Sequence, residues 1–112
     1  MGKELLFAAL KAPRPSEKQL SQAIVDLGRL LGFRVHRNWS EMHSPKGWPD
    51  LVLCKPPRLI FAEIKSQDGK VTEEQQEWLD LLAQVPGIEV HLWRPADFEE
   101  IAAILQGKGN AL

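Results

Sequence analysis

The sequence predicts a single α/β domain in which helices cover both faces of one mixed sheet. Two segments, residues 16–31 and 72–85, combine a capping-box pattern at their start with apolar residues at helical spacing. Four short segments read as strands, and the central pair, residues 51–54 and 59–64, is apolar on both faces. Strands of that kind are covered from both sides. The expected order is α-β-β-β-α-β, followed by an additional C-terminal helix.

Length and composition point to one ordinary globular domain. The chain has 112 residues, of which 44% are hydrophobic and 26% charged, enough for a single core. The one cysteine, Cys54, excludes an internal disulfide and fits a reducing compartment, so we expect a cytoplasmic protein. No apolar run approaches the roughly 20 residues of a membrane span, so no membrane partner is expected.

Charge is unevenly distributed along the chain, although the net charge is only −1. Residues 1–70 hold 12 Lys and Arg against 7 Asp and Glu, whereas residues 71–112 hold 2 against 8. A net charge near zero argues mildly against a nucleic-acid partner, because phosphate binding favours basic domains. The basic N-terminal part nevertheless allows a locally positive face.

The chain begins with a segment whose structure the sequence does not decide. Residues 1–15 contain a short apolar stretch that ends at Pro13 and Pro15. This segment is compatible with a short helix or an extended arm, packed on its own domain or on a second subunit.

The first helix is expected from Ser16 to about Leu31. Ser16 and Gln19 form a capping box, and Gly32 follows the last turn as a C-cap. Glu17 falls on the apolar stripe of this helix. A carboxylate there either complements the helix dipole in the first turn or points at a functional site. The stripe consists of Leu20, Ile24, Leu27 and Leu31.

The first strand is expected over residues 33–37. Phe33 and Val35 share its apolar face, and basic residues occupy the rest. Among these, Arg37 either meets phosphate or is simply solvated.

Residues 38–46 are rich in turn formers and read as a loop that leads into the central hairpin. His43 and Lys46 lie in this loop, where substrate-facing groups are often found. A lone loop histidine usually has no such role. Trp39 and Trp48 either stack on exposed bases or take part in ordinary packing.

The central hairpin brings two carboxylates together. If its turn is centred between the two prolines at 56–57, Cys54 pairs with Leu59, and counting outward places Asp50 opposite Glu63. Lys65 follows two residues later and shares the face of Glu63. A slip of one residue would move the two carboxylates to opposite faces, so this prediction depends on the register.

Facing carboxylates repel each other, and a divalent cation between them removes that cost. Mg²⁺ suits the pair, because it binds a few carboxylate oxygens and keeps waters that substrate phosphate can replace. The ammonium of Lys65 would stand beside the metal, where it can orient a water or neutralise phosphate charge. The alternative is a surface hairpin with an incidental Glu–Lys pair, which burial on both faces argues against.

The second helix is expected to begin after Thr72, which forms a capping box with Gln75, and to end near residue 86. Gln75 lies three residues before Trp78 on the inward stripe. Its role is therefore either capping alone or contact with the site. Lys70 precedes the helix and can reach phosphate.

The chain is expected to close with a strand and a short helix. Residues 88–93 alternate as a strand, and Asp97 is the expected cap of a helix that ends at Gly107. Residues 108–112 read as a frayed tail.

The motifs of the central region resemble a known nuclease signature. Pro49-Asp50, followed thirteen residues later by Glu63-Ile64-Lys65, resembles the PD-(D/E)xK motif. Together with Glu17 before it, Gly47-Trp48 at its start, and Gln75 with Trp78 after it, the pattern resembles the VRR-NUC family over roughly residues 16–105.

This resemblance implies a restriction-endonuclease-like αβββαβ core in a nuclease domain over residues 16–107. It implies that Asp50 and Glu63 bind Mg²⁺ or Mn²⁺, with the backbone carbonyl of Ile64 as a further ligand. Lys65 would then position the attacking water. Glu17 would complete the acidic cluster directly or through water, and the resemblance makes Gln75 an active-site residue.

The implied activity is metal-dependent hydrolysis of DNA by an endonuclease. The chain resembles stand-alone phage and bacterial members associated with branched DNA such as Holliday junctions, and symmetric junction cleavage requires two active sites, hence a homodimer. Arg37, His43, Lys46, Trp48 and Lys70 are the candidate DNA contacts. The alternatives are a restriction-like or flap-processing endonuclease, an inactive nucleic-acid-binding module of the same fold, and an interaction protein whose charged cluster is a salt-bridge network.

Overall fold

The computed structural model describes residues 15–39 and 41–107. Nearly all of the expected N-terminal arm and the expected tail at 108–112 lie outside these residues. None of the helices in the described ranges is long and apolar enough to cross a membrane. The helices and strands are α2 (Glu17–Leu30), β1 (Arg34–Arg37), β2 (Leu51–Lys55), β3 (Arg58–Ile64), α3 (Glu73–Ala83), β4 (Glu89–Trp93) and α4 (Phe98–Leu105), with 3-10 turns η1 (Glu41–His43) and η2 (Pro95–Asp97).

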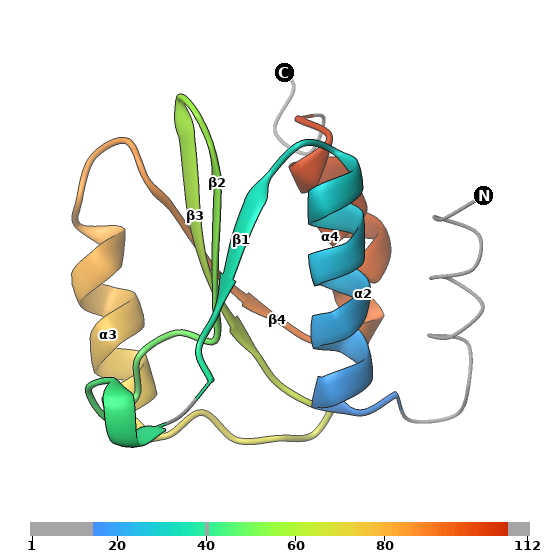
Figure 1. Ribbon diagram of the computed structural model, residues 1–112. Coiled ribbons are helices and arrows are strands. Elements are labelled where there is room, and N and C mark those ends of the chain that lie inside the picture. The colour runs from blue at the N-terminus through green and yellow to red at the C-terminus, as the bar shows by residue number, and fades with distance from the viewer. Residues whose placement is uncertain (1–14, 40, 108–112) are drawn as a thin grey trace.

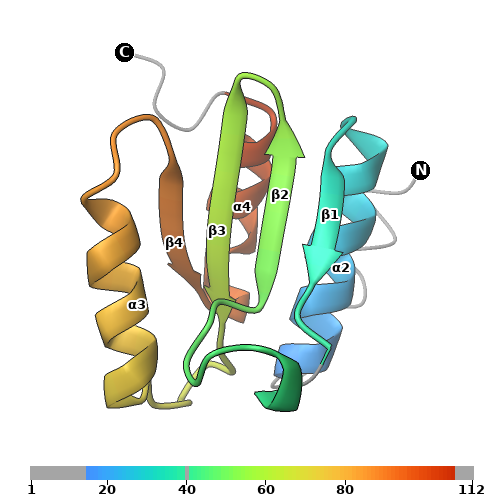
Figure 2. The same ribbon diagram turned by 60° about the vertical axis from the view of Figure 1, so that its left-hand side comes forward.

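These elements form one mixed sheet between two helical layers, which confirms the predicted fold. The strand order is β1-β2-β3-β4, with antiparallel pairing along β1-β2-β3 and parallel pairing of β3 with β4. Helices α2 and α4 cover one face of the sheet, and α3 lies on the opposite side (Figure 1). Seen toward the sheet, the start of β2 and the end of β3 lie at the same edge as the first turns of α2 and α3 (Figure 2).

The central hairpin has the register on which the predicted site depends. Cys54 pairs with Leu59 and Leu51 with Ala62, so Asp50 and Glu63 are the next positions outward on the two strands. The face toward α2 and α4 is fully buried, while the face toward α3 is half-buried. The apolar residues of the buried face are Leu51, Leu53, Ile60, Ala62 and Ile64.

Both predicted capping boxes form. Ser16 Oγ accepts the Gln19 N–H at 3.0 Å, and Gln19 Oε1 accepts the Ser16 N–H at 2.9 Å. The same reciprocal pair joins Thr72 and Gln75, at 3.1 and 2.9 Å. Each box satisfies two N–H groups that a helix start otherwise leaves unpaired. The two helix starts at the edge of the sheet are therefore well ordered and fixed in direction.

The last helix differs from the prediction in how it begins. Asp97 occupies the N-cap position, but its side chain makes no capping bond to α4. Instead, Asp97 Oδ2 accepts the Arg94 N–H at 2.9 Å, across the 3-10 turn that Pro95 starts. Pro95 starts a 3-10 turn directly before α4, and the Asp97 carboxylate therefore caps this turn instead of α4.

Gly47 lets the chain pass against the first turn of α3. Its φ is +85°, and a Cβ there would lie 2.5 Å from the carbonyl carbon of Glu74 and 2.7 Å from the nitrogen of Gln75. Only glycine combines that backbone angle with so close an approach. The next residue, Trp48, packs edge-on against Trp78 of α3 at 4.8 Å between ring centroids. The segment leading to β2 is therefore fastened to α3.

We predict that Gly47→Ala destabilises the protein by well over the ~1–2 kcal/mol that a positive φ alone costs a residue with a Cβ. Gly87→Ala is the matched control, because Gly87 has φ +87° but nothing within 4 Å of the added Cβ. Chemical denaturation of both variants measures the two costs. Equal losses of unfolding free energy would contradict the close approach at Gly47.

Candidate active site

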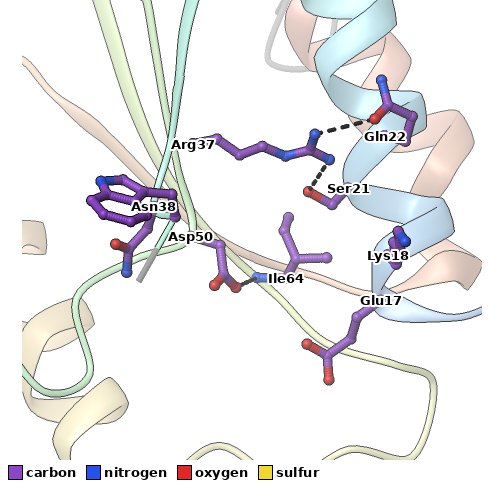
Figure 3. Close-up of a pocket in the computed structure, with 9 residues that line it drawn as sticks. Glu17, Lys18, Ser21, Gln22, Arg37, Asn38, Asp50 and Ile64 are labelled. Atoms are coloured by element: carbon purple, nitrogen blue, oxygen red, sulfur yellow. Dashed lines mark hydrogen bonds between the residues drawn. The ribbon is translucent and has the colours of Figure 1, made fainter. Parts of the chain in front are cut away.

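Asp50 is held at the edge of the sheet by contacts to both neighbouring strands. Its backbone carbonyl accepts the Asn38 N–H at 2.8 Å, just beyond the end of β1. Its side-chain Oδ2 accepts the Ile64 N–H at 2.9 Å, at the end of β3 (Figure 3). The carboxylate therefore has a fixed orientation beside the last residues of β3.

Glu63 is buried, with 2% of its surface exposed. Its Oε2 accepts a hydrogen bond from Gln75 Nε2 at 3.1 Å. Its Oε1 is also buried and has no hydrogen-bond partner among the described residues. A buried carboxylate oxygen without a partner lowers the stability of the fold. This atom is therefore suited to bind a ligand or to keep a proton.

The surroundings of Glu63 strongly favour its protonated form. Burial, the largest cause, together with a side-chain hydrogen bond and the negative charge of Asp50, raises the pKa of Glu63 from its ordinary value near 4.5 to about 9. The positive charge of Lys65 opposes this rise, and Glu17 adds to it. Without a bound cation, Glu63 thus keeps its proton at neutral pH.

Lys65 lies on the same strand end, with only 9% of its surface exposed. Its backbone N–H donates to the Trp93 carbonyl at 3.0 Å, which extends the pairing of β3 with β4 by one residue. Among residues 15–39 and 41–107, no side chain or carbonyl forms a hydrogen bond or ion pair with its ammonium. A nearly buried cation that has no fixed partner can act on a substrate.

Arg94 fixes the loop that follows Lys65. One of its guanidinium nitrogens, Nη1, donates to the carbonyls of Ser66 at 2.8 Å, Gly69 at 2.7 Å and Gln67 at 3.2 Å. Gln67 in turn accepts the Ala96 N–H at 3.0 Å. Because the loop is held from the end of β4, the position of Lys65 does not depend on loop motion.

Gln75 joins the start of α3 to Glu63. Its Oε1 accepts the Thr72 N–H in the capping box, so the amide nitrogen must face the other way, where it donates to Glu63. The structure thus gives Gln75 a definite contact with the site. The side chain thus both caps α3 and contacts the Glu63 carboxylate.

Glu17 lies near the two central acids. It is exposed at the start of α2, lines the same pocket as Asp50, and contributes to the raised pKa of Glu63. Figure 3 shows the Glu17 and Asp50 carboxylates on opposite sides of this pocket. Within the described ranges, however, no three His, Cys, Asp or Glu side chains are grouped tightly enough to hold a metal ion. Contact of Glu17 with an ion would therefore run through water or need a side-chain rotation.

The pocket beside Asp50 has a volume of about 570 Å³ and is lined mostly by polar and charged residues. Arg37 reaches into it from β1, and its guanidinium donates to Gln22 at 3.1 Å and to Ser21 at 3.3 Å on α2 (Figure 3). These bonds orient the cation at the pocket wall. The lining residues are Glu17, Lys18, Ser21, Gln22, Arg37, Asn38, Trp39, Asp50 and Ile64.

The other candidate DNA contacts have different surroundings. Lys46 lies 3.6 Å from the carboxylate of Glu74. Trp48 packs against Trp78 and Phe61, which favours the packing alternative, although it also borders a small cavity shared with Asp50 and Gln75. Lys70 and His43 are exposed, and neither lines the pockets beside Asp50.

Sequence reasoning left Asn38 and Arg94 out of the candidate site, and it left open whether Trp39 stacks on bases or only packs. Asn38 could have been found, because pairing the strand at 33–37 with β2 places it across from Asp50. No local sequence pattern predicts the hydrogen bonds of Arg94, since they join residues about 25 positions apart in the sequence. His43 stacks on Trp39 at 4.1 Å between centroids, and Trp39 borders both cavities beside Asp50.

The arrangement fits a hard divalent cation. Such ions take carboxylate oxygens as ligands, and Glu63 Oε1 is a buried oxygen that lacks a donor beside a second carboxylate. A bound cation would replace the proton that Glu63 otherwise keeps, so its uptake releases a proton.

We predict that Glu63→Gln stabilises the metal-free protein at pH 8 but not near pH 4. The raised pKa means that the unfolded chain loses the Glu63 proton above about pH 4.5, while the folded chain keeps it up to about pH 9. The wild type therefore loses stability relative to the variant as pH rises through this window. We expect a melting temperature higher by at least about 4 °C for the variant at pH 8.

Adding Mg²⁺ at pH 8 should raise the melting temperature of the wild type and leave that of Glu63→Gln nearly unchanged. Thermal unfolding at several pH values, with and without Mg²⁺, measures both effects. A melting-temperature difference that does not change with pH would contradict the assignment of Glu63 as the protonated acid.

Comparison with known proteins identifies the family of this chain. The family model of the VRR-NUC domain matches residues 4–96, which include the elements from α2 to β4 but not Asp97 or any of α4. No curated protein and no solved structure is similar enough to the chain to count as a match. The match covers most of the chain, and the Pro-Asp and Glu-Ile-Lys segments fall inside it. The chain therefore belongs to the VRR-NUC family, whose domain is a nuclease domain of the PD-(D/E)xK type.

Proposed function

We propose that this protein is a Mg²⁺- or Mn²⁺-dependent endonuclease that hydrolyses phosphodiester bonds in DNA. The observation that carries the proposal is the buried, unpartnered Oε1 of Glu63 beside the carboxyl of Asp50. In an interaction protein, a salt-bridge network would pair these acids with cations. Here the described residues leave both an acid oxygen and the Lys65 ammonium without a fixed partner.

Asp50 and Glu63 are the side chains that would hold the ion, with the Ile64 carbonyl as a further ligand. When bound, the ion lowers the pKa of water and offsets the charge that develops on the scissile phosphate. Asp50 is suited to this role because its other contacts, through its own carbonyl and through the Ile64 N–H, keep the carboxylate in place. Three oxygen ligands from the protein would leave the remaining positions to water and substrate.

Lys65 provides the protein's own contribution to the chemistry. Its ammonium donates hydrogen bonds to the attacking water or to a phosphate oxygen, which orients the nucleophile and reduces the negative charge of the phosphate. Low exposure and the loop held by Arg94 limit the motion of the Lys65 side chain. Gln75 acts through Glu63, since its amide holds the carboxylate in one orientation. Glu17 contributes negative charge at the rim and reaches an ion through water.

Contacts to the DNA backbone would come from the polar pocket beside Asp50. Arg37 and Lys18 line it, and the N-terminal part of the chain carries the excess of basic residues. Lys46, Lys70 and His43 would reach phosphates farther from the scissile bond. Branched DNA such as a Holliday junction is the substrate we propose, cut by a homodimer because paired incisions need two sites.

We predict that the purified protein cuts DNA with Mg²⁺ or Mn²⁺ and not with EDTA. Glu63→Ala and Lys65→Ala should each lower the cleavage rate by about 100-fold or more, because one removes an ion ligand and the other removes the ammonium whose charge acts on Glu63. Glu77→Ala, which removes an exposed carboxylate of α3, is the control and should leave the rate unchanged. A panel of supercoiled, linear, nicked, flap and four-way DNA identifies the preferred substrate.

Equal activity of the wild type and Glu63→Ala would overturn the proposed function. Binding to the same DNAs without cleavage under any metal would favour the inactive binding module instead. A preference for flaps over four-way junctions would support the nuclease and exclude the junction as its main substrate.

Gln75 allows a sharper test, because α2 carries the same capping box without a contact to Glu63. Gln75→Ala and Gln19→Ala should each cost about 1 kcal/mol of stability through the lost cap. Only Gln75→Ala should also lower the cleavage rate, by about 10- to 100-fold, as expected when the partner of an ion ligand is removed. Denaturation and single-turnover cleavage of both variants give the comparison. Equal loss of activity in the two variants would show that Gln75 only caps its helix.

A further inference from the structure

Trp39 is placed and oriented in a way that packing does not explain. It is 73% exposed, although burial of the indole would stabilise the folded chain. Its ring is nevertheless held in one orientation, because His43 stacks on it at 4.1 Å between centroids with 25° between the planes. An exposed aromatic ring that is fixed from one side presents a flat surface to a ligand.

The location of Trp39 indicates which ligand this is. Trp39 lines the 570 Å³ pocket on the α2 side of Asp50 and also the smaller cavity formed with Gly47 and Gln75. It therefore stands between the two hollows that meet at the ion-binding carboxylate. The larger hollow is within the range of about 300–1,000 Å³ typical of small-molecule pockets, which accommodates one nucleotide.

We propose that Trp39 is a stacking platform for an unpaired nucleobase next to the scissile phosphate. The inference rests on the proposed function, because it places the phosphate of that strand at Asp50 and Glu63. A base inside a duplex has neighbours on both faces and cannot stack on the indole, whereas a base at a gap, flap or junction has a free face. The site would therefore select DNA with at least one base whose face is unstacked at the point of cleavage, as at a gap, a flap or an open four-way junction.

The rest of the pocket suits a nucleotide without fixing its base. Arg37 lies on the wall, where it can meet a phosphate, and Asn38 can offer its amide nitrogen, since its Oδ1 already accepts the Ser44 hydroxyl at 2.8 Å. Stacking tolerates all four bases because each has an aromatic face. The chain would accordingly recognise the unpaired state of the nucleotide more than its sequence.

Binding measured in EDTA tests the platform without any contribution from cleavage. The probe is one labelled duplex, compared with the same duplex carrying a four-nucleotide gap. The 2-aminopurine lies in the continuous strand, opposite that gap. Trp39→Ala should weaken binding to the gapped DNA by about tenfold and leave binding to the intact duplex within about twofold. Trp39→Phe should retain most of the affinity, and quenching of 2-aminopurine on binding should be lost only in Trp39→Ala.

Leu81→Ala is the matched control, because Leu81 is another exposed apolar side chain, 56% exposed on α3, and lies away from the pocket. It should bind both DNAs as the wild type does. Because Trp39 is so exposed, its variants should unfold at the wild-type temperature, which circular dichroism checks. Equal weakening of both DNAs by Trp39→Ala, or no weakening of either, would overturn the platform.

The two proposals can fail separately. A preference for gapped DNA that depends on Trp39, in a protein that cuts no DNA with Mg²⁺, would support the stacking role of Trp39 and contradict the proposed nuclease function. Cleavage of intact duplex at the same rate by the wild type and Trp39→Ala would support the nuclease function and contradict the stacking role of Trp39.

Discussion

The structure depends on the pairing of a buried acid with a second acid at the edge of a sheet. Glu63 is almost inaccessible to water, and this burial, together with the hydrogen bond and charge of Asp50 beside it, holds its pKa far above the ordinary range. A fold does not gain stability from such a pair, since burying an unpaired charge is unfavourable. The pair is explained if a cation takes the place of the proton on Glu63, so the proposed function accounts for a feature that lowers the stability of the fold.

The surrounding elements keep this unfavourable pair in place. The Asn38 and Ile64 N–H groups hold Asp50, and the amide of Gln75 holds Glu63. At a greater distance, Gly47 fastens the entry to β2 against α3, and Arg94 fixes the loop behind Lys65. Each of these contacts joins a strand end to a neighbouring element. The site is thus preorganised by the rigid parts of the fold rather than by the loops alone.

Much of this arrangement could be predicted from the sequence, because its signals are local. The two prolines centre the hairpin turn, so counting outward gave the correct register for the acids, and the capping boxes gave both helix starts. Contacts between distant segments could not be predicted. Neither the approach of Gly47 to α3 nor the three bonds of Arg94 leaves a periodic pattern, and the capping bond expected from Asp97 was displaced by the turn that Pro95 starts.

A crystal structure of the protein grown with Mn²⁺ tests the central claim most directly, since anomalous scattering locates the ion without any assumption about activity. The account predicts one peak within about 2 Å of oxygens from both Asp50 and Glu63, with the Glu63 side chain still held by Gln75. An ion bound elsewhere, or the two carboxylates turned away from each other around an empty site, would contradict it.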